Sequence, residues 1–441
     1  MLMSAGQEAL WLAHQLDPHS SAFNVVLAVR VRSPLARARL ERAVTALAER
    51  HELLRSTFTM TAAGRHLRAL RPADSVRLDV RPVPGASDAE LFDLARRAGE
   101  EPFALETSGA FRVVLLTRAP GEAVLVTAAH HLVTDATSQW LLMRDLLRLY
   151  EDPGASLPAV LPWDDRVRTE QQLTASARGE RAREHWRTVC ASLAGAELLS
   201  DHPRPAQRTL NGATHTLELP ATLGARVQSS AAAHGITPFA WLLGTFQAAL
   251  YRFGCGTDFL VGCPATTRSV PGSRDAVGYY VNILPIAARF EATPTFGDVI
   301  SAAARQMLAG MTHNGLPTEL CDALPPLPVT FTLVAADRLP VPGLFDGPVR
   351  HAGLDLELVD VPQQEGQLDL TVEVLQSGSR FTALLRYNRD LFLPETVERL
   401  AGIYRLMVEA SVEDPGQPVT RPAVVAENDL AFLLSLGSGA L

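Results

Sequence analysis

The sequence contains no lysine: all 40 of its basic residues are arginine. Without a lysine amine the chain cannot form a Schiff base with a substrate or with pyridoxal phosphate, and it cannot build the phosphate-binding loop that needs lysine. Cysteine is scarce too. The four cysteines have neither CxxC pairing nor zinc-finger spacing, and they are Cys190, Cys255, Cys263 and Cys321. We therefore interpret them as separate reduced thiols and expect no metal site.

Several catalytic and targeting motifs are missing as well. The sequence has no GxSxG, HExxH or GxGxxG pattern, so the usual signatures of α/β hydrolases, zinc proteases and dinucleotide-binding proteins are absent. Residues 1–6 lack the features of a secretory signal, and apolar stretches such as 239–251 are too short to span a bilayer. A net charge of -8 disfavours a nucleic-acid partner. We expect a cytoplasmic protein that binds neither nucleic acid nor membrane.

The chemically most informative segment is 130–135, which reads HHLVTD. It follows a short apolar run at 123–129 that predicts a buried strand, and it precedes an amphipathic helical pattern. Because neighbouring strand residues point to opposite faces, His130 and His131 are not expected to share a metal, and only one of them can face a given substrate. The local residues alone leave open an ordinary strand-turn-helix with incidental histidines.

Cap and turn residues predict the surrounding elements. Thr137 or Ser138 is the expected N-cap of the helix after the histidines, and Ser33 with Pro34 predicts the start of an earlier helix. A capping-box pattern at Ser87 and Glu90 predicts another. Helices and strands are therefore mixed from the start of the chain.

The chain is long enough for two domains, and a proline-rich, polar stretch at 152–177 is the predicted linker. We expect an N-terminal unit at 1–175, a C-terminal unit at 176–420 and a linker-like tail at 421–441. The second unit is predicted to contain a helix at 238–253, a closing helix at 394–410 and strands at 214–219, 259–262, 280–289, 329–334, 368–376 and 381–387. Its alternation of strands and helices resembles that of the first unit.

Five further segments, in order along the chain, make the histidine segment recognisable. They are Ser4 to Gln7 with Leu10 and Trp11, residues 50–58 (RHELLRSTF), residues 258–264 (DFLVGCP) with Arg268, residues 277–282 (VGYYVN) and residues 387–392 (YNRDLF). Together with HHxxxD, the sequence resembles the condensation domains of nonribosomal peptide synthetases over nearly its whole length. The family signature is HHxxxDG, and here Ala136 replaces the glycine.

The resemblance implies a mixed α/β fold of two chloramphenicol-acetyltransferase-like subdomains arranged in a V with a central substrate tunnel. It implies that His131 is the catalytic histidine, acting as general base or as a hydrogen-bond partner that positions the amine. His130, Asp135, Ala136 and Arg268 would support the site, with Asp135 paired to Arg268. Asn282 is a candidate for binding pantetheine or the reacting carbonyl, and a strand asparagine satisfied by nearby backbone is the equally weighted alternative.

The function implied is condensation of a carrier-bound acyl or peptidyl thioester with a carrier-bound amine, giving an amide or an ester. No covalent cofactor is expected, because donor and acceptor carrier proteins would supply the 4′-phosphopantetheine arms. We expect a monomer or a part of a multidomain synthetase. Two alternatives remain: an acyltransferase of the same superfamily that uses a coenzyme A thioester or an alcohol acceptor, and a non-catalytic domain that binds carriers.

Overall fold

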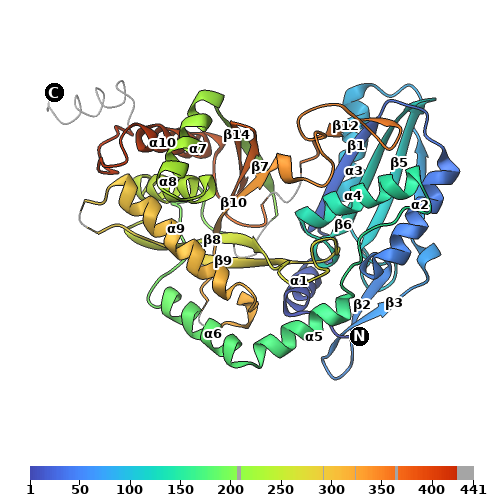
Figure 1. The fold of residues 1–441 in the computed structure, drawn as a ribbon, viewed down its shortest axis with the longest axis horizontal. Coiled ribbons are helices and arrows are strands. Elements are labelled where there is room, and N and C mark those ends of the chain that lie inside the picture. The colour runs from blue at the N-terminus through green and yellow to red at the C-terminus, as the bar shows by residue number, and fades with distance from the viewer. Residues whose placement is uncertain (206–209, 292, 323, 363–365, 425–441) are drawn as a thin grey trace.

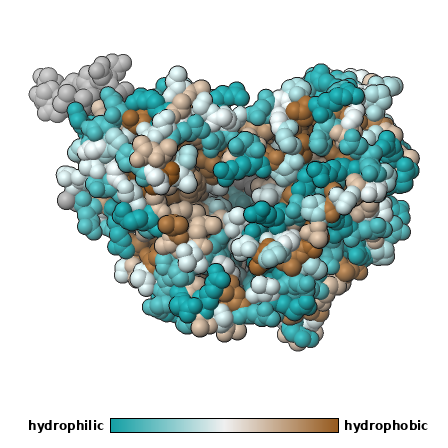
Figure 2. All heavy atoms as spheres, in the orientation of Figure 1, coloured by the Kyte–Doolittle hydropathy of each residue, from teal (hydrophilic) through white to brown (hydrophobic). Residues whose placement is uncertain are grey.

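The computed structural model describes residues 1–205, 210–291, 293–322, 324–362 and 366–424. The chain forms two lobes of mixed α/β structure that lie side by side (Figure 1), with a notch between them on the molecular surface (Figure 2). Each lobe contains one six-stranded mixed sheet and its own apolar core. The predicted fold class and the pair of similar halves are therefore present. The linker-like tail expected at 421–441 lies outside the described residues from 425 onward.

The first lobe carries the histidine segment between a strand and a helix. Its elements are α1 (Ala5–Leu16), β1 (Asn24–Val31), α2 (Arg37–Arg50), η1 (Glu52–Arg55), β2 (Ser56–Met60), β3 (His66–Leu70), η2 (Ala73–Ser75), β4 (Leu78–Pro82), α3 (Asp88–Glu100), β5 (Phe111–Ala119), β6 (Glu122–His130), η3 (His131–Val133) and α4 (Ala136–Glu151). The histidines lie at the end of β6, a central strand that pairs antiparallel with β1 and β5. Residues 123–130 of β6 are all buried, which explains their continuous apolar pattern.

One helix occupies much of the predicted linker, and a second begins at its last residue. They are α5 (Trp163–Thr174) and α6 (Ala177–Cys190), and they run beneath the notch from one lobe to the other (Figure 1). The prolines at 153, 158 and 162 precede α5, and the Pro162 residue is its N-cap. The connection between the lobes is thus largely helical.

The second lobe repeats the combination of one sheet with covering helices. Its elements are β7 (Gly212–Leu219), α7 (Ala221–Ala233), α8 (Pro238–Phe253), β8 (Asp258–Thr266), β9 (Val281–Arg289), α9 (Phe296–His313), η4 (Thr318–Leu320), β10 (Val329–Ala335), η5 (Ala336–Arg338), β13 (Leu370–Ser377), β14 (Arg380–Asn388) and α10 (Pro394–Glu413). The strands are ordered β7-β14-β13-β10-β8-β9. The helix predicted at 238–253 has the observed bounds, and the predicted strands agree to within a few residues.

One segment of the second half of the chain belongs to the first lobe. Strands β11 (Val349–His351) and β12 (Leu354–Val359) extend the first sheet, because β12 pairs antiparallel with β1. The expected unit at 176–420 is therefore interrupted by residues that pair with the other lobe. The interruption has a physical reason, because Leu354, Leu356 and Val359 are buried in the apolar core of the first lobe.

The same crossover explains a wrong cap prediction. Helix α2 begins at Arg37 after Ala36, which makes no capping hydrogen bond, and it does not begin at Ser33 and Pro34. The Ser33 hydroxyl instead accepts a hydrogen bond from the backbone N–H of Asp355, the second residue of β12. The capping box of Ser87 and Glu90 is present at α3 as predicted.

Candidate active site

The two histidines are placed by the end of β6. The backbone N–H of His130 donates to the carbonyl of Ala110 at 2.9 Å, and that of His131 donates to the carbonyl of Phe23 at 2.7 Å. The chain then forms the short helix η3 before α4 begins. The His130 side chain is buried, whereas the His131 side chain is partly exposed. The two imidazoles thus lie in different surroundings, at the junction where β6 ends at His130 and η3 begins at His131.

The protonation pattern of His131 follows from one contact. Its Nδ1 lies 2.8 Å from the carbonyl oxygen of Thr134. A carbonyl can only accept, so Nδ1 carries the proton and Nε2 of the neutral ring has a free lone pair. Burial lowers the pKa of His131, while the Thr134 carbonyl and the charge of Asp135 partly offset this effect. The imidazole of His131 is therefore neutral at pH 7.

His130 has the opposite arrangement. Its Nδ1 accepts a hydrogen bond from the backbone N–H of Leu132 at 3.1 Å, so its proton is on Nε2. The ring packs against His14 and Phe23 with centroid distances of 5.3 and 5.9 Å. Burial, with smaller effects of His14 and His131, holds the pKa of His130 well below its usual value. This residue supports the turn from inside the lobe.

Asp135 is the N-cap of α4, not Thr137 or Ser138 as predicted. Its Oδ1 accepts from the backbone N–H of Ser138 at 2.7 Å, and its Oδ2 accepts from that of Tyr280 at 3.0 Å. Arg268 donates to both carboxylate oxygens, at 2.7 and 3.0 Å, so the expected ion pair is present. Burial would raise the pKa of Asp135, but the charge and hydrogen bonds of Arg268, together with Ser138, lower it overall. The carboxylate is fully occupied by protein groups.

Ser138 fastens α4 to the segment 267–280 of the second lobe. Its hydroxyl donates to the carbonyl of Gly278 at 2.9 Å and accepts from the backbone N–H of Gly278 at 3.1 Å. Arg268 also donates to this hydroxyl at 2.6 Å. A side chain at Gly278 would collide with Trp163, whose Cζ3 lies 2.2 Å from the site of an added Cβ. The contact therefore requires glycine at position 278. It also uses the hydroxyl of Ser138, which the sequence offers as a cap for α4.

Tyr279 connects this segment to the catalytic candidate. Its ring meets that of His131 edge to face, with a centroid distance of 5.1 Å and an interplanar angle of 84°. On the other side it lies against Gly6 of α1, where an added Cβ would be 2.5 Å from Tyr279 Cε1. Residues from α1 and β6 of the first lobe and from the second lobe therefore meet around His131.

The comparisons with known proteins agree with this arrangement. The family model described as "Condensation domain" matches residues 1–434. The chain belongs to the condensation-domain family. It is 28% identical to malpinin synthetase of Mortierella alpina over 98% of its length, and 28% identical to phosphinothricin tripeptide synthetase PhsC of Streptomyces viridochromogenes over 98%. It spans only 6% of the first protein and 41% of the second.

Solved structures show the same condensation-domain fold. The X-domain from teicoplanin biosynthesis superposes with a TM-score of 0.86 at 23% identity, covering 96% of this chain and 97% of that one. The first condensation domain of the calcium-dependent antibiotic synthetase, in complex with a substrate analogue, gives 0.78 at 22% identity, covering 96% and 99%. Identities this low establish the fold alone.

Ala136, the departure from the condensation-domain signature, fits without strain. It is the first residue of α4, its side chain is exposed, and its φ is not positive. A left-handed glycine is therefore not required at this position. The methyl group leaves the Asp135 cap and the Thr134 carbonyl in place.

The contacts of Asn282 do not support the expected role in binding pantetheine. Its Nδ2 donates to the carbonyls of Asn314 and Leu316, and its Oδ1 accepts from the backbone N–H and the hydroxyl of Thr318. Both donors and both acceptor positions of the buried amide are thereby used. Asn282 instead fixes the turn between α9 and η4. This is the alternative that sequence reasoning left open.

Cavities lie between the lobes of the condensation domain. One, of about 150 Å³, is lined by residues 20–22, Asn24 and Val361 from the first lobe and by Leu210 and Gly212 from the second. A smaller one, of about 10 Å³, is lined by Gly6, Tyr279, Asn282 and Glu319 among others. Figure 2 shows the molecular surface hollowed at the notch between the lobes. The second cavity includes Tyr279, whose ring contacts His131.

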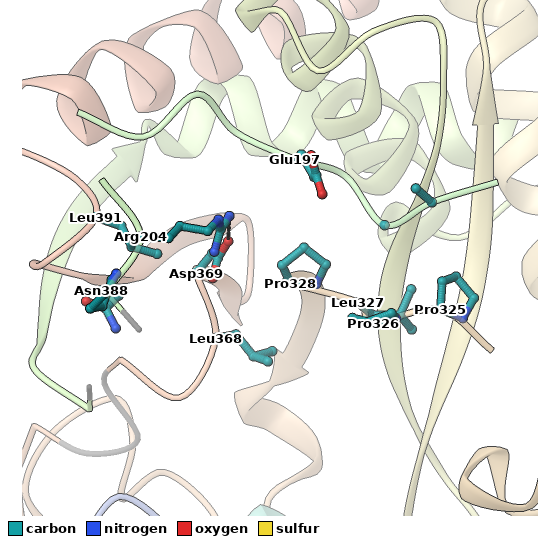
Figure 3. Close-up of a pocket in the computed structure, with 13 residues that line it drawn as sticks. Glu197, Arg204, Pro325, Pro326, Leu327, Pro328, Leu368, Asp369, Asn388 and Leu391 are labelled. Carbon is teal, nitrogen blue, oxygen red and sulfur yellow. Dashed lines mark hydrogen bonds and ion pairs between the residues drawn. The ribbon is translucent and has the colours of Figure 1, made fainter. Parts of the chain in front are cut away.

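A larger cavity, about 590 Å³, lies in the second lobe away from the histidines. Prolines 325, 326 and 328 form one wall, and the ion pair of Arg204 and Asp369 lies between them and the residues Asn388 and Leu391 (Figure 3). Asp369 is buried and has the role of pairing partner that its position between two leucines suggests.

Two absences concern the described part of the chain. Within that part, no group of three or more histidine, cysteine, aspartate or glutamate side chains could hold a metal ion. Nor does any helix in these ranges have the length and apolar character needed to cross a membrane.

Proposed function

We propose that this condensation domain transfers an acyl or peptidyl group from a carrier-bound thioester to a carrier-bound amine. The observation that carries the proposal is the state of His131, whose Nδ1 proton is held by the Thr134 carbonyl. Nε2 is therefore a free acceptor in a partly exposed ring, and the lowered pKa keeps it unprotonated at pH 7. A general base for an amine needs these properties.

The reaction balances with protein groups and the two substrates alone. The amine nitrogen attacks the thioester carbon, and its proton passes to Nε2 of His131. The tetrahedral intermediate then collapses, the carbon–sulfur bond breaks, and the imidazolium returns the proton to the leaving thiolate. His131 would serve equally well by orienting the amine through Nε2, since proximity of two bound substrates supplies about 7–11 kcal/mol of barrier reduction. A hydroxyl acceptor would give an ester by the same sequence.

The partners follow from the substrates. Both are carried on 4′-phosphopantetheine arms, which separate donor and acceptor carrier proteins would bring to the domain, so the chain itself needs no bound cofactor. The cavity of about 150 Å³ between the lobes is a candidate entry for one of these arms. We place the domain in a cytoplasmic assembly line for nonribosomal peptides or hybrid polyketide–peptide products, with His130, Asp135, Ala136 and Arg268 supporting the catalytic residue.

The test is condensation between a donor-loaded and an acceptor-loaded carrier, followed by mass spectrometry. The wild-type chain is expected to form product, and His131→Ala is expected to lose it while keeping its melting temperature. His202→Ala is the matched control, because His202 is an exposed histidine in the second lobe. Full turnover by His131→Ala would refute the catalytic assignment.

Parallel reactions with coenzyme A thioesters separate the alternatives. Turnover with coenzyme A substrates but not with carriers would identify a free acyltransferase. Carrier binding without turnover of either substrate would identify a non-catalytic domain.

A further inference from the structure

Gln7 is a fully buried amide in the first turn of α1, within the opening segment 4–7 that the sequence singles out. Its side-chain oxygen accepts two hydrogen bonds, from the backbone N–H of Ser4 at 3.1 Å and from the indole N–H of Trp163 at 2.8 Å. Its amide nitrogen donates to the carbonyl of Leu132 at 3.0 Å. Because two donors hold the oxygen, the orientation of the amide is fixed, and its nitrogen faces η3.

The carbonyl that Gln7 binds belongs to the turn that carries His131. The Leu132 residue of this turn is held on both sides, since its backbone N–H donates to Nδ1 of His130 and its carbonyl accepts from Gln7. The bond that closes η3, from the Thr134 N–H to the His131 carbonyl, is long at 3.3 Å. The Thr134 carbonyl that accepts from Nδ1 of His131 comes two residues after Leu132. Its position therefore depends on contacts from outside the turn.

The same end of α1 is tied to the helix that leads toward the second lobe. Trp163, which donates to Gln7, is the first residue of α5, and the backbone N–H of Ala5 donates to Glu170 of that helix at 2.8 Å. Figure 1 shows α5 running from the first lobe beneath the notch. Gln7 thus connects α5 directly to the backbone beside His131.

We infer that Gln7 is a positioning residue, which fixes the turn at Leu132 so that the proton of His131 stays on Nδ1 and Nε2 is free for the acceptor amine. This inference rests on the proposed function. Without the amide donor, the Leu132 carbonyl is a buried acceptor without a partner, and the turn moves to satisfy it. That movement takes the Thr134 carbonyl away from Nδ1. The proton of the neutral ring can then reside on Nε2, which no longer accepts a proton from the amine.

The tautomer of His131 is measured without turnover by nitrogen NMR of the histidine-labelled full chain, because protonated and unprotonated ring nitrogens have well-separated chemical shifts. His131→Ala identifies the two resonances. At pH 7 the wild type is expected to show a protonated Nδ1 and an unprotonated Nε2. Gln7→Met, which keeps the length of the side chain without its polar atoms, is expected to move the two resonances toward each other as the second tautomer becomes populated.

Gln7→Glu retains more of the native contacts and covers the case that Gln7→Met fails to fold. Its carboxylate still accepts from Ser4 and Trp163, which favours the ionised form, but it has no proton to donate to Leu132. Both variants are expected to lower kcat for condensation by about tenfold or more, because a misplacement of about 1 Å costs up to about 100-fold in rate. The KM for the loaded acceptor carrier should stay near the wild-type value.

The matched control is Gln306→Met in the second lobe. Gln306 of α9 also makes a pair of hydrogen bonds, donating to the carbonyl of Ala287 at 2.7 Å and accepting from its backbone N–H at 2.8 Å. Its loss is expected to lower the melting temperature while leaving the His131 resonances and kcat unchanged.

Four results would overturn the inference: an Nε2–H tautomer in the wild type, an unchanged tautomer in a folded Gln7 variant, an equal shift in Gln306→Met, or loss of folding in both Gln7 variants. A shifted tautomer in the Gln7 variants of a protein that forms no condensation product would instead count against the proposed function alone.

Discussion

At the scale of single residues, two adjacent histidines acquire opposite tautomers. His131 donates from Nδ1 to a carbonyl, and His130 accepts at Nδ1 from a backbone N–H. The sequence predicts that they face different sides, because strand geometry alone decides that. It does not predict the tautomers, since these depend on where the η3 turn places the Thr134 carbonyl and the Leu132 amide. A base at Nε2 is therefore a property of the turn as much as of the imidazole.

The site also depends on a residue without a side chain. In Gly6→Ala the new Cβ would lie 2.5 Å from Tyr279 Cε1, so the tyrosine ring has to move away from α1. Because that ring contacts His131, we expect condensation to slow by at least tenfold. The melting temperature should change little, since alanine is the better helix former. Product formation and thermal unfolding, measured side by side, check this prediction.

Gly402→Ala is the matched control for that change. It replaces an exposed glycine of α10 that has no atom within 4 Å of the added Cβ, so activity should be unchanged. Unimpaired condensation in Gly6→Ala would show that the Tyr279 position does not matter for the reaction.

At the scale of elements, the start of α4 is decided by a segment from the other lobe. Ser138 is a good cap by propensity, but Gly278 and Arg268 occupy its hydroxyl, and Asp135 caps the helix instead. Local cap preferences could not reveal this, because the competing partners lie about 130 residues further along the chain. The pairing of Asp135 with Arg268 was available only through the family resemblance. The long-range contact therefore overrides the local rule.

Asp135→Ala is expected to lower stability and activity together. It leaves Arg268 buried without its counter-ion, and breaking a buried pair costs about 3–5 kcal/mol of unfolding free energy. Replacing both partners by apolar residues, as in Asp135→Ala with Arg268→Met, should recover part of this loss. Denaturant unfolding of the wild type, the single variant and the double variant measures the three values. Lost activity with an unchanged unfolding curve would mean that Asp135 acts in the chemistry itself.

At the scale of the whole molecule, the sequence predicts the content of the two lobes better than their connections. Apolar periodicity and turn residues locate most strands and helices, because these signals are local. The predicted linker at 152–177 contains α5, and residues 349–359 return to the first sheet. The return of residues 349–359 has no local signal, because a strand that joins a distant sheet has the same alternation of residues as a strand that stays in its own sheet. The site around His131 shares this origin, since Tyr279 and Arg268 reach it from the second lobe.

The crossover predicts that a residue late in the chain stabilises the first lobe. Leu356 of β12 is buried in that lobe's core, opposite Val31 of β1, so Leu356→Ala should cost about 2–5 kcal/mol there. Hydrogen exchange is expected to accelerate in β1 and β6, while β13 keeps its protection. Leu385→Ala, an equally buried strand leucine of the second core, is the matched control and should produce the reverse pattern. If Leu356→Ala instead loosened β13 first, the lobes would not be independent cores, and the crossover strand would stabilise the molecule through the second lobe.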